Sequence, residues 1–184
     1  MDHHLEKLLV STGTWGLFET DWRAQCEAFG EDFDQYAVGS LPVLRAIATE
    51  SPKDAGVFAL RGDDGSYAAI AQVNSTLLPG YEGKVLRVRH LLLSPTLDYG
   101  ELSLEDYANI MGRMFSRTVY LAASEMPSAH VKFHLRSPAD RQFFSSALSM
   151  LKDFAIFSSV AMRGAWLYLT LNIAPTKGAN GEVG

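Results

Sequence analysis

The chain has 184 residues, of which 47% are hydrophobic and 20% are charged, and its formal net charge is −5 at pH 7. This length predicts one domain, and this hydrophobic content predicts a packed core and excludes a wholly disordered chain. The negative net charge argues against nucleic acid as a partner, because the phosphate backbone attracts proteins with an excess of Lys and Arg.

The single cysteine, Cys26, excludes an intramolecular disulfide, which fits a reducing compartment and a cytoplasmic location. It lies in an expected helix, and we interpret it as a half-buried apolar residue rather than a nucleophile. No segment is long and apolar enough to predict a membrane span. We expect one domain over residues 1–174 and a disordered tail, rich in Gly and Ala, over residues 175–184.

The first half of the chain predicts a short strand, two helices and then three consecutive strands. Trp22, Cys26 and Phe29 recur at helical spacing in the first helix, and Pro42 predicts a break or a start in the second. The segment 62–65, Gly-Asp-Asp-Gly, is a strong hairpin-turn signal. The expected elements are a strand at 7–12, helices at 19–29 and 33–48, and strands at 56–61, 67–76 and 84–93.

The second half predicts alternating helices and strands. Ser103 is a favourable N-cap for a long helix, and Ser137 followed by Pro138 begins another helix in the same way. The expected elements are helices at 103–125 and 137–153 and strands at 129–136, 154–162 and 165–173. This order predicts an α/β (α+β) fold with a mixed, mostly antiparallel sheet flanked by helices.

The order of elements resembles the GNAT N-acetyltransferase fold over roughly residues 57–171, and the segment from Leu91 to Ser103 occupies the place of that family's cofactor loop. In the family, an apolar strand end leads through a basic, glycine-rich loop into a helix N-terminus that binds the pyrophosphate of acetyl-CoA. The resemblance implies a divergent member and acetyl-CoA as its cofactor. It also implies four residues that contact the cofactor: Leu93, Thr96, Gly100 and Ser103.

The loop departs from the family pattern in both shape and charge. Only Gly100 remains of the family's glycines, and Asp98, Glu101 and Glu105 place negative charge where the phosphates would lie. Like charges near an anion oppose its binding. The acetyl-CoA loop is therefore eroded in this chain.

A second departure concerns the helix that begins near Ser137. Aligned with the family, Ser137 stands where an Asn is usual, and Phe144 stands where a Tyr often serves as general acid. Phenylalanine has no hydroxyl and cannot donate a proton. Three explanations stay open: a variant loop that still binds acetyl-CoA, a fold that has lost this cofactor, or an alignment that is mistaken.

Two expected strands carry basic residues at alternate positions. Arg87 and Arg89 share one face of the strand before the long helix, and Lys132, His134 and Arg136 share one face of the strand after it. Parallel strands usually read as apolar runs, so a basic face there is unusual. These side chains either line a cleft for an anionic ligand or form a solvated face.

Among the histidines, His134 is the candidate catalytic base, because imidazole titrates near neutral pH. His90 shares its face with apolar neighbours and is interpreted as a core histidine. No His, Cys, Asp or Glu spacing indicates a metal site, so none is expected.

The segment from Phe33 to Tyr36, after a helix that contains Arg23, resembles the start of acyl-homoserine-lactone synthases, which share the GNAT-like core. That family carries Glu-x-x-Arg on the strand that aligns with residues 84–93. Here Lys84 stands three residues before Arg87, and the second register is apolar at the same place, so the pattern fails at its acid.

The leading function predicted from the sequence is a divergent GNAT-like acyltransferase that moves an acyl group from acyl-CoA to an unknown amine. One alternative is a non-catalytic binding or interaction domain on the same scaffold, and a second is an acyl-homoserine-lactone-synthase-like enzyme. A small-molecule ligand and a homodimer are compatible with the sequence, and neither nucleic acid nor a membrane is expected as a partner.

Overall fold

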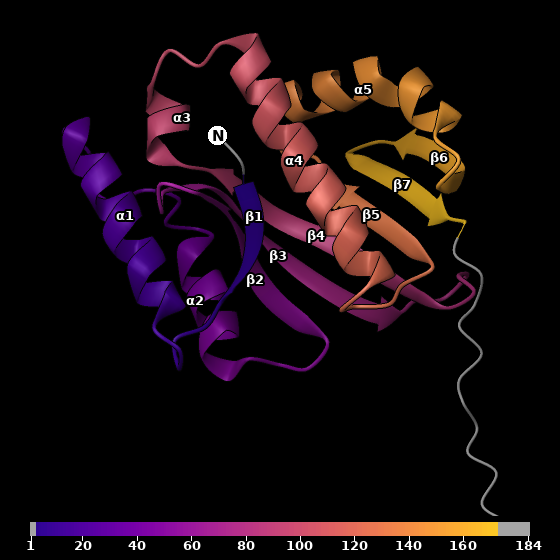
Figure 1. Ribbon diagram of the computed structural model, residues 1–184, viewed down its shortest axis with the longest axis horizontal. Helices are drawn as coiled ribbons and strands as arrows, with labels where there is room; N and C mark the ends of the chain where they lie inside the picture. The colour runs from indigo at the N-terminus through magenta and orange to yellow at the C-terminus, as the bar shows by residue number, and fades with distance from the viewer. Residues whose placement is uncertain (1–2, 173–184) are drawn as a thin grey trace, which may run out of the picture.

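The computed structural model describes residues 3–172 and places their strands in one sheet, in the order β1-β2-β3-β4-β5-β7-β6 (Figure 1). Every neighbouring pair is antiparallel except β4 and β5, which run parallel. The mixed, mostly antiparallel sheet is therefore confirmed, whereas residues 175–184 lie outside the described residues. The strands are β1 (His3–Leu8), β2 (Ala55–Gly62), β3 (Tyr67–Leu77), β4 (Lys84–Leu93), β5 (His130–His134), β6 (Phe157–Arg163) and β7 (Trp166–Leu171).

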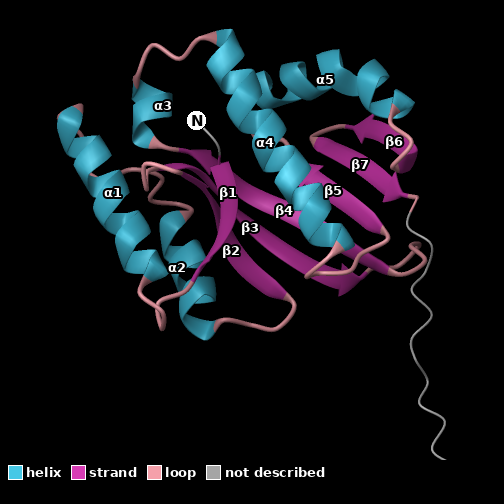
Figure 2. Cartoon of the chain, viewed as in Figure 1, coloured by secondary structure: helices cyan, strands magenta, loops and turns pink. Residues whose placement is uncertain are grey.

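Helices cover both faces of the sheet. On one face, α1 and α2 pack against β1, β2 and β3, and on the other face α4 packs against β1, β3 and β5 and α5 packs against β6 (Figure 2). Each face therefore has its own cluster of buried side chains. The helices are α1 (Thr14–Ala28), α2 (Leu41–Glu50), α3 (Pro95–Tyr99), α4 (Leu104–Ala123) and α5 (Pro138–Asp153).

Side-chain caps begin the two helices that flank the parallel pair. The Oγ atom of Ser103 accepts a hydrogen bond from the Asp106 amide at 3.1 Å. At α5, the Oγ atom of Ser137 accepts from the Asp140 amide at 2.9 Å, and the Asp140 carboxylate accepts from the Ser137 amide at 2.9 Å. Asp thus completes a capping box in which Glu or Gln is more usual.

Four expectations for the elements are wrong. The strand expected at 7–12 is β1, which begins at His3 and ends at Leu8, because residues 10–13 form a turn before α1. The helix expected at 33–48 begins at Leu41, because Pro42 occupies its first turn and the preceding residues form turns. The first helix begins at Thr14 rather than near residue 19, directly after Gly13 at φ 81°. The loop expected at 94–102 contains the short helix α3, which the sequence pattern did not indicate.

Phe144 lies in the core. Its side chain is 2% exposed, and its ring centroid is 5.6 Å from that of Phe115 and 6.0 Å from that of Phe133. A tyrosine at this position would place its hydroxyl inside an aromatic cluster. The missing hydroxyl at residue 144 therefore says nothing about catalysis in this protein.

We expect Phe144→Tyr to lower the free energy of unfolding by about 1–3 kcal/mol, because the added hydroxyl is buried without a partner. The matched control is Phe143→Tyr at the neighbouring half-buried ring, where the change should stay within about 0.5 kcal/mol. Urea denaturation followed by circular dichroism measures both. Equal stabilities for the two variants would contradict the buried position of Phe144.

Candidate functional site

A cleft lies where the parallel strand β5 ends and its neighbour β4 continues. Their pairing runs from Val85 opposite His130 to Val88 opposite Phe133 and stops there, while β4 continues to Leu93. A cavity of about 730 Å³ lies at this point, within the range of roughly 300–1,000 Å³ that is typical of ligand sites. We call it the β4–β5 cleft; its lining comes from the end of β4, from the segment between α1 and α2, and from the start of α5.

A strained residue in β4 marks the start of the cleft. His90 has a φ of 48°, and the register of β4 with β3 shifts at the same place. A positive φ is uncommon outside glycine, and a bulge re-aims the side chains around it. His90 is half-buried and its Nδ1 atom lies 3.3 Å from the Oγ atom of Ser40, so its interpretation as a core histidine is wrong.

Three segments meet at the mouth of the cleft through Ser40. This residue immediately precedes α2, and its hydroxyl accepts a hydrogen bond from Nη1 of Arg136 at 3.0 Å. Both Ser40 and Arg136 line the β4–β5 cleft. The contact therefore joins the α1–α2 segment, the bulge of β4 at His90 and the residues that follow β5.

Tyr36 fixes the end of β4. Its hydroxyl donates to the carbonyl oxygen of Leu93 at 2.8 Å and lies 3.3 Å from the Asp98 carboxylate. Burial, followed by the nearby Asp98, raises the pKa of Tyr36 well above its usual range, so the phenol stays protonated. The segment from Phe33 to Tyr36 resembles the start of acyl-homoserine-lactone synthases in sequence, and the structure shows that Tyr36 of this segment contacts the end of β4.

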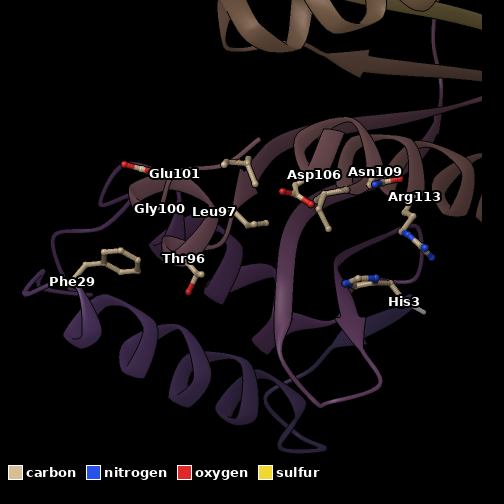
Figure 3. Close-up of a pocket in the computed structure, with 11 residues that line it drawn as sticks. His3, Phe29, Thr96, Leu97, Gly100, Glu101, Asp106, Asn109 and Arg113 are labelled. Atoms are coloured by element: carbon tan, nitrogen blue, oxygen red, sulfur yellow. The ribbon is translucent and has the colours of Figure 1, made fainter. Parts of the chain in front are cut away.

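The residues expected to contact the cofactor do not line one cavity. Leu93 lines the β4–β5 cleft, whereas Thr96 and Gly100 line a second cavity of about 470 Å³ on the other side of the loop. Figure 3 shows this second cavity, with Thr96 and Gly100 on the α3 side and Arg113 of α4 opposite. Ser103 lies at a third, mostly apolar cavity between α4 and α5.

The backbone around residue 100 leaves no room for a side chain, so glycine is required there. A Cβ atom at this position would lie 2.3 Å from the carbonyl oxygen of Thr96, closer than atoms can approach. The amides of Thr96, Gly100 and Leu102 already donate to acceptors within the protein, at 2.9–3.2 Å. Within residues 3–172, the amides of Leu104 and Glu105 have no acceptor, so the first turn of α4 keeps donors for a ligand.

The basic residues of β4 and β5 share one face of the sheet. Arg87 pairs with Lys132 across the parallel ladder, and paired residues point to the same side. The alternate positions, Leu86 and Val88, belong to the core under α4 and α5. On the opposite face α1 and α2 pack mainly against β1 to β3, and Arg87, Arg89, Lys132 and His134 are half-exposed.

Aromatic rings hold this basic face together. The Nζ atom of Lys132 lies 4.6 Å from the ring centroid of Tyr168, 4.9 Å from that of Trp166 and 5.7 Å from that of Tyr81. The His134 ring lies 4.6 Å from the Trp166 ring, centroid to centroid. Cation–π contacts of this kind position the cations on the sheet. His134 is therefore fixed on the basic face, outside the lining of the β4–β5 cleft.

No protein-family model matches the chain, and no curated protein matches its sequence. Its structure is similar to the crystal structure of a probable acetyltransferase from Staphylococcus epidermidis ATCC 12228, with a TM-score of 0.50, 12% identity, and coverage of 92% of this chain and 96% of that chain. The chain has the GNAT fold. The low identity marks it as a divergent example, and the likeness concerns the fold alone.

Two further solved structures are similar at lower scores. One is a possible acetyltransferase from Clostridium difficile 630, with a TM-score of 0.49, 7% identity, and coverage of 89% of this chain and 100% of that chain. The other is AtaTR bound with AcCoA, with a TM-score of 0.48, 10% identity, and coverage of 92% and 93%.

The Cys26 thiol is not exposed to a ligand. Cys26 is fully buried, and burial is the largest cause that raises the pKa of its thiol. In the part of the chain that the structure describes, no group of three or more His, Cys, Asp or Glu residues is arranged to hold a metal ion. None of the described helices is long and apolar enough to cross a membrane.

Burial and nearby arginines lower the pKa of both His90 and His134. Burial is the largest cause that lowers the pKa of His134, followed by the charges of Arg136 and Arg89. The pKa of His90 is lowered by the same causes in the same order, with a further contribution from His134. A neutral imidazole is the form that accepts a proton.

We expect Arg136→Gln to raise the pKa of both His90 and His134, because one positive neighbour is removed. The two values should stay below the ordinary imidazole value, since burial and Arg89 remain. An NMR titration of the imidazole protons measures the shifts. The control is Arg163→Gln, on the same sheet but absent from the causes of either shift; an equal effect of both variants would contradict the arrangement.

Proposed function

We propose that this protein transfers an acyl group from an acyl-CoA thioester to an amine within the β4–β5 cleft. One observation carries the proposal: the pairing of β4 with β5 ends at Val88, which leaves the edge of β4 from Leu91 to Leu93 beside a cavity of about 730 Å³. An exposed strand edge can pair with an extended ligand through main-chain hydrogen bonds. The amide-containing arm of CoA is such a ligand.

Acyl-CoA fits the site in shape and in backbone donors. The amides of Leu104 and Glu105 and the positive end of the α4 dipole favour phosphate groups, and the apolar end of β4 suits the arm. The carboxylates of Asp98, Glu101 and Glu105 oppose the same phosphates and weaken the binding. When bound, acyl-CoA would supply a thioester carbon that the amine attacks.

The residues of this chain would prepare the amine. An amine attacks only when its nitrogen is unprotonated, so a base beside the cleft removes the proton. His134 is our proposed base, because its lowered pKa keeps it neutral and the Trp166 ring fixes its orientation. His90 is the competing candidate, because the bulge brings it to Ser40, which lines the cleft.

A non-catalytic ligand-binding domain is the second candidate function. It is favoured by the acidic loop and by the loop amides that already have acceptors within the protein. The acyl-homoserine-lactone-synthase-like alternative gains no specific support, because Arg23 is engaged by Asp34 at 3.1 Å and stacks over the Phe33 ring.

Isothermal titration calorimetry with acetyl-CoA tests the proposal. We expect saturable binding that tightens about 3- to 10-fold in Glu101→Gln/Glu105→Gln, because a charge near a helix N-terminus contributes about 0.3–1 kcal/mol. Glu125→Gln, beyond the other end of α4, is the charge-matched control and should leave the affinity unchanged. Absence of binding to the wild type and to the double variant would contradict acyl-CoA as the donor and leave the ligand-binding domain.

Once an amine that the protein acetylates has been found, the dependence of kcat/KM on pH identifies the base. We expect His134→Gln to lower kcat/KM by about 10²- to 10⁴-fold and to remove the acidic limb of the profile. The control is His90→Asn, because Asn tolerates the positive φ at this position, and it should keep the acidic limb. Loss of the limb in His90→Asn instead would identify His90 as the base and overturn our assignment.

A further inference from the structure

Charge is strongly segregated in this acidic chain. The formal net charge is −5, yet β4, β5, β6 and β7 contain no Asp or Glu. Their charged residues are all basic, and Arg136 lies two residues after the end of β5. A net charge averaged over the chain therefore hides a local basic surface. Such a surface attracts anions by its own field.

The guanidinium groups of this surface have no acidic partner. In residues 3–172, no ion pair joins Arg87, Arg89, Lys132 or Arg136 to a carboxylate. The Nε atoms of Arg87 and Arg89 are buried and have no hydrogen-bond acceptor within this range. A buried donor without an acceptor destabilises the folded protein. An oxyanion would supply the missing acceptor.

The surface favours a compact anion over a nucleic acid strand. Nucleic acid strands bind basic grooves in which bases stack on free aromatic faces. Here the rings already contact the protein's own side chains: His134 and Lys132 lie against Trp166, and Lys132 lies against Tyr168. Bases would have to displace these contacts. The same contacts hold the cations in place and lower the entropy cost of binding a small anion.

The basic surface reaches the mouth of the β4–β5 cleft. Arg136 lines this cleft and donates to Ser40, whose hydroxyl lies 3.3 Å from Nδ1 of His90. Arg89 and His134 contact the same ring, because the Arg89 guanidinium lies 5.8 Å and the His134 ring 4.6 Å from the Trp166 ring centroid. An anion held by the two arginines would therefore lie beside both candidate bases. It would also offset the positive charge that disfavours the protonated imidazole.

We propose that Arg89 and Arg136 form an anion-binding site for the acyl acceptor, which is therefore an amine that also carries a phosphate or a carboxylate group. Guanidinium groups suit both oxyanions, because their planar N–H donors can bind two oxygens at once. The acceptor role rests on the proposed acyl transfer, whereas the anion site can be measured without acyl-CoA.

Calorimetric titration with three small amines tests the site on the full chain without cofactor. Phosphoethanolamine carries a phosphate, β-alanine carries a carboxylate, and ethanolamine carries neither. We expect saturable binding of phosphoethanolamine or β-alanine and none of ethanolamine, and the stronger of the two identifies the oxyanion. Equal binding of all three amines, or binding of none, would overturn the proposal.

Variants localise the site. We expect Arg89→Gln and Arg136→Gln each to weaken binding of the anionic amine at least 10-fold, with melting temperatures that confirm folding. Lys152→Gln in the last turn of α5 is the matched loss of one positive charge and should leave the affinity unchanged. An equal loss in Lys152→Gln would show attraction by net charge alone and overturn the site.

The same preparations separate this proposal from acyl transfer. Binding of acetyl-CoA without binding of either anionic amine overturns the anion site and leaves acyl transfer standing. Binding of an anionic amine without binding of acetyl-CoA overturns acyl transfer and the acceptor role together. Binding of both, with transfer only to the anionic amine, supports both proposals.

Discussion

The site depends on how far two parallel strands stay paired. β4 and β5 are joined through α4 and pair only from Val85 to Val88, because β5 ends at His134 while β4 continues to Leu93. A longer β5 would extend the ladder and cover this edge of β4. The bulge at His90 lies in the part of β4 that has no partner on the β5 side.

The two faces of β4 and β5 differ in burial. Under α4 and α5, alternate residues such as Leu86 and Phe133 build the core. On the opposite face, α1 and α2 end their contacts at β3, and the basic residues of β4 and β5 remain partly open to solvent. Ser40 joins this open face to the cleft, because it contacts both His90 and Arg136.

The segment between β4 and α4 combines features for and against a phosphate ligand. Its turn needs Gly100 for a close backbone approach, and several of its amides serve the protein's own hydrogen bonds. Within residues 3–172, the amides of Leu104 and Glu105 in the first turn of α4 have no acceptor, and they lie next to exposed carboxylates. Such a segment binds phosphates more weakly than a glycine-rich, basic loop. A donor site of this kind would rely on the strand edge more than on the loop.

The sequence by itself determined the sheet strands, the caps at Ser103 and Ser137 and the basic alternation of β4 and β5, because these follow from local periodicity and local hydrogen bonds. Only the tertiary structure decided that Phe144 is in the core, that His90 lies at a strained bulge and that Arg89 and His134 contact the same Trp166 ring. These facts depend on contacts between segments far apart in the chain, which local patterns do not encode.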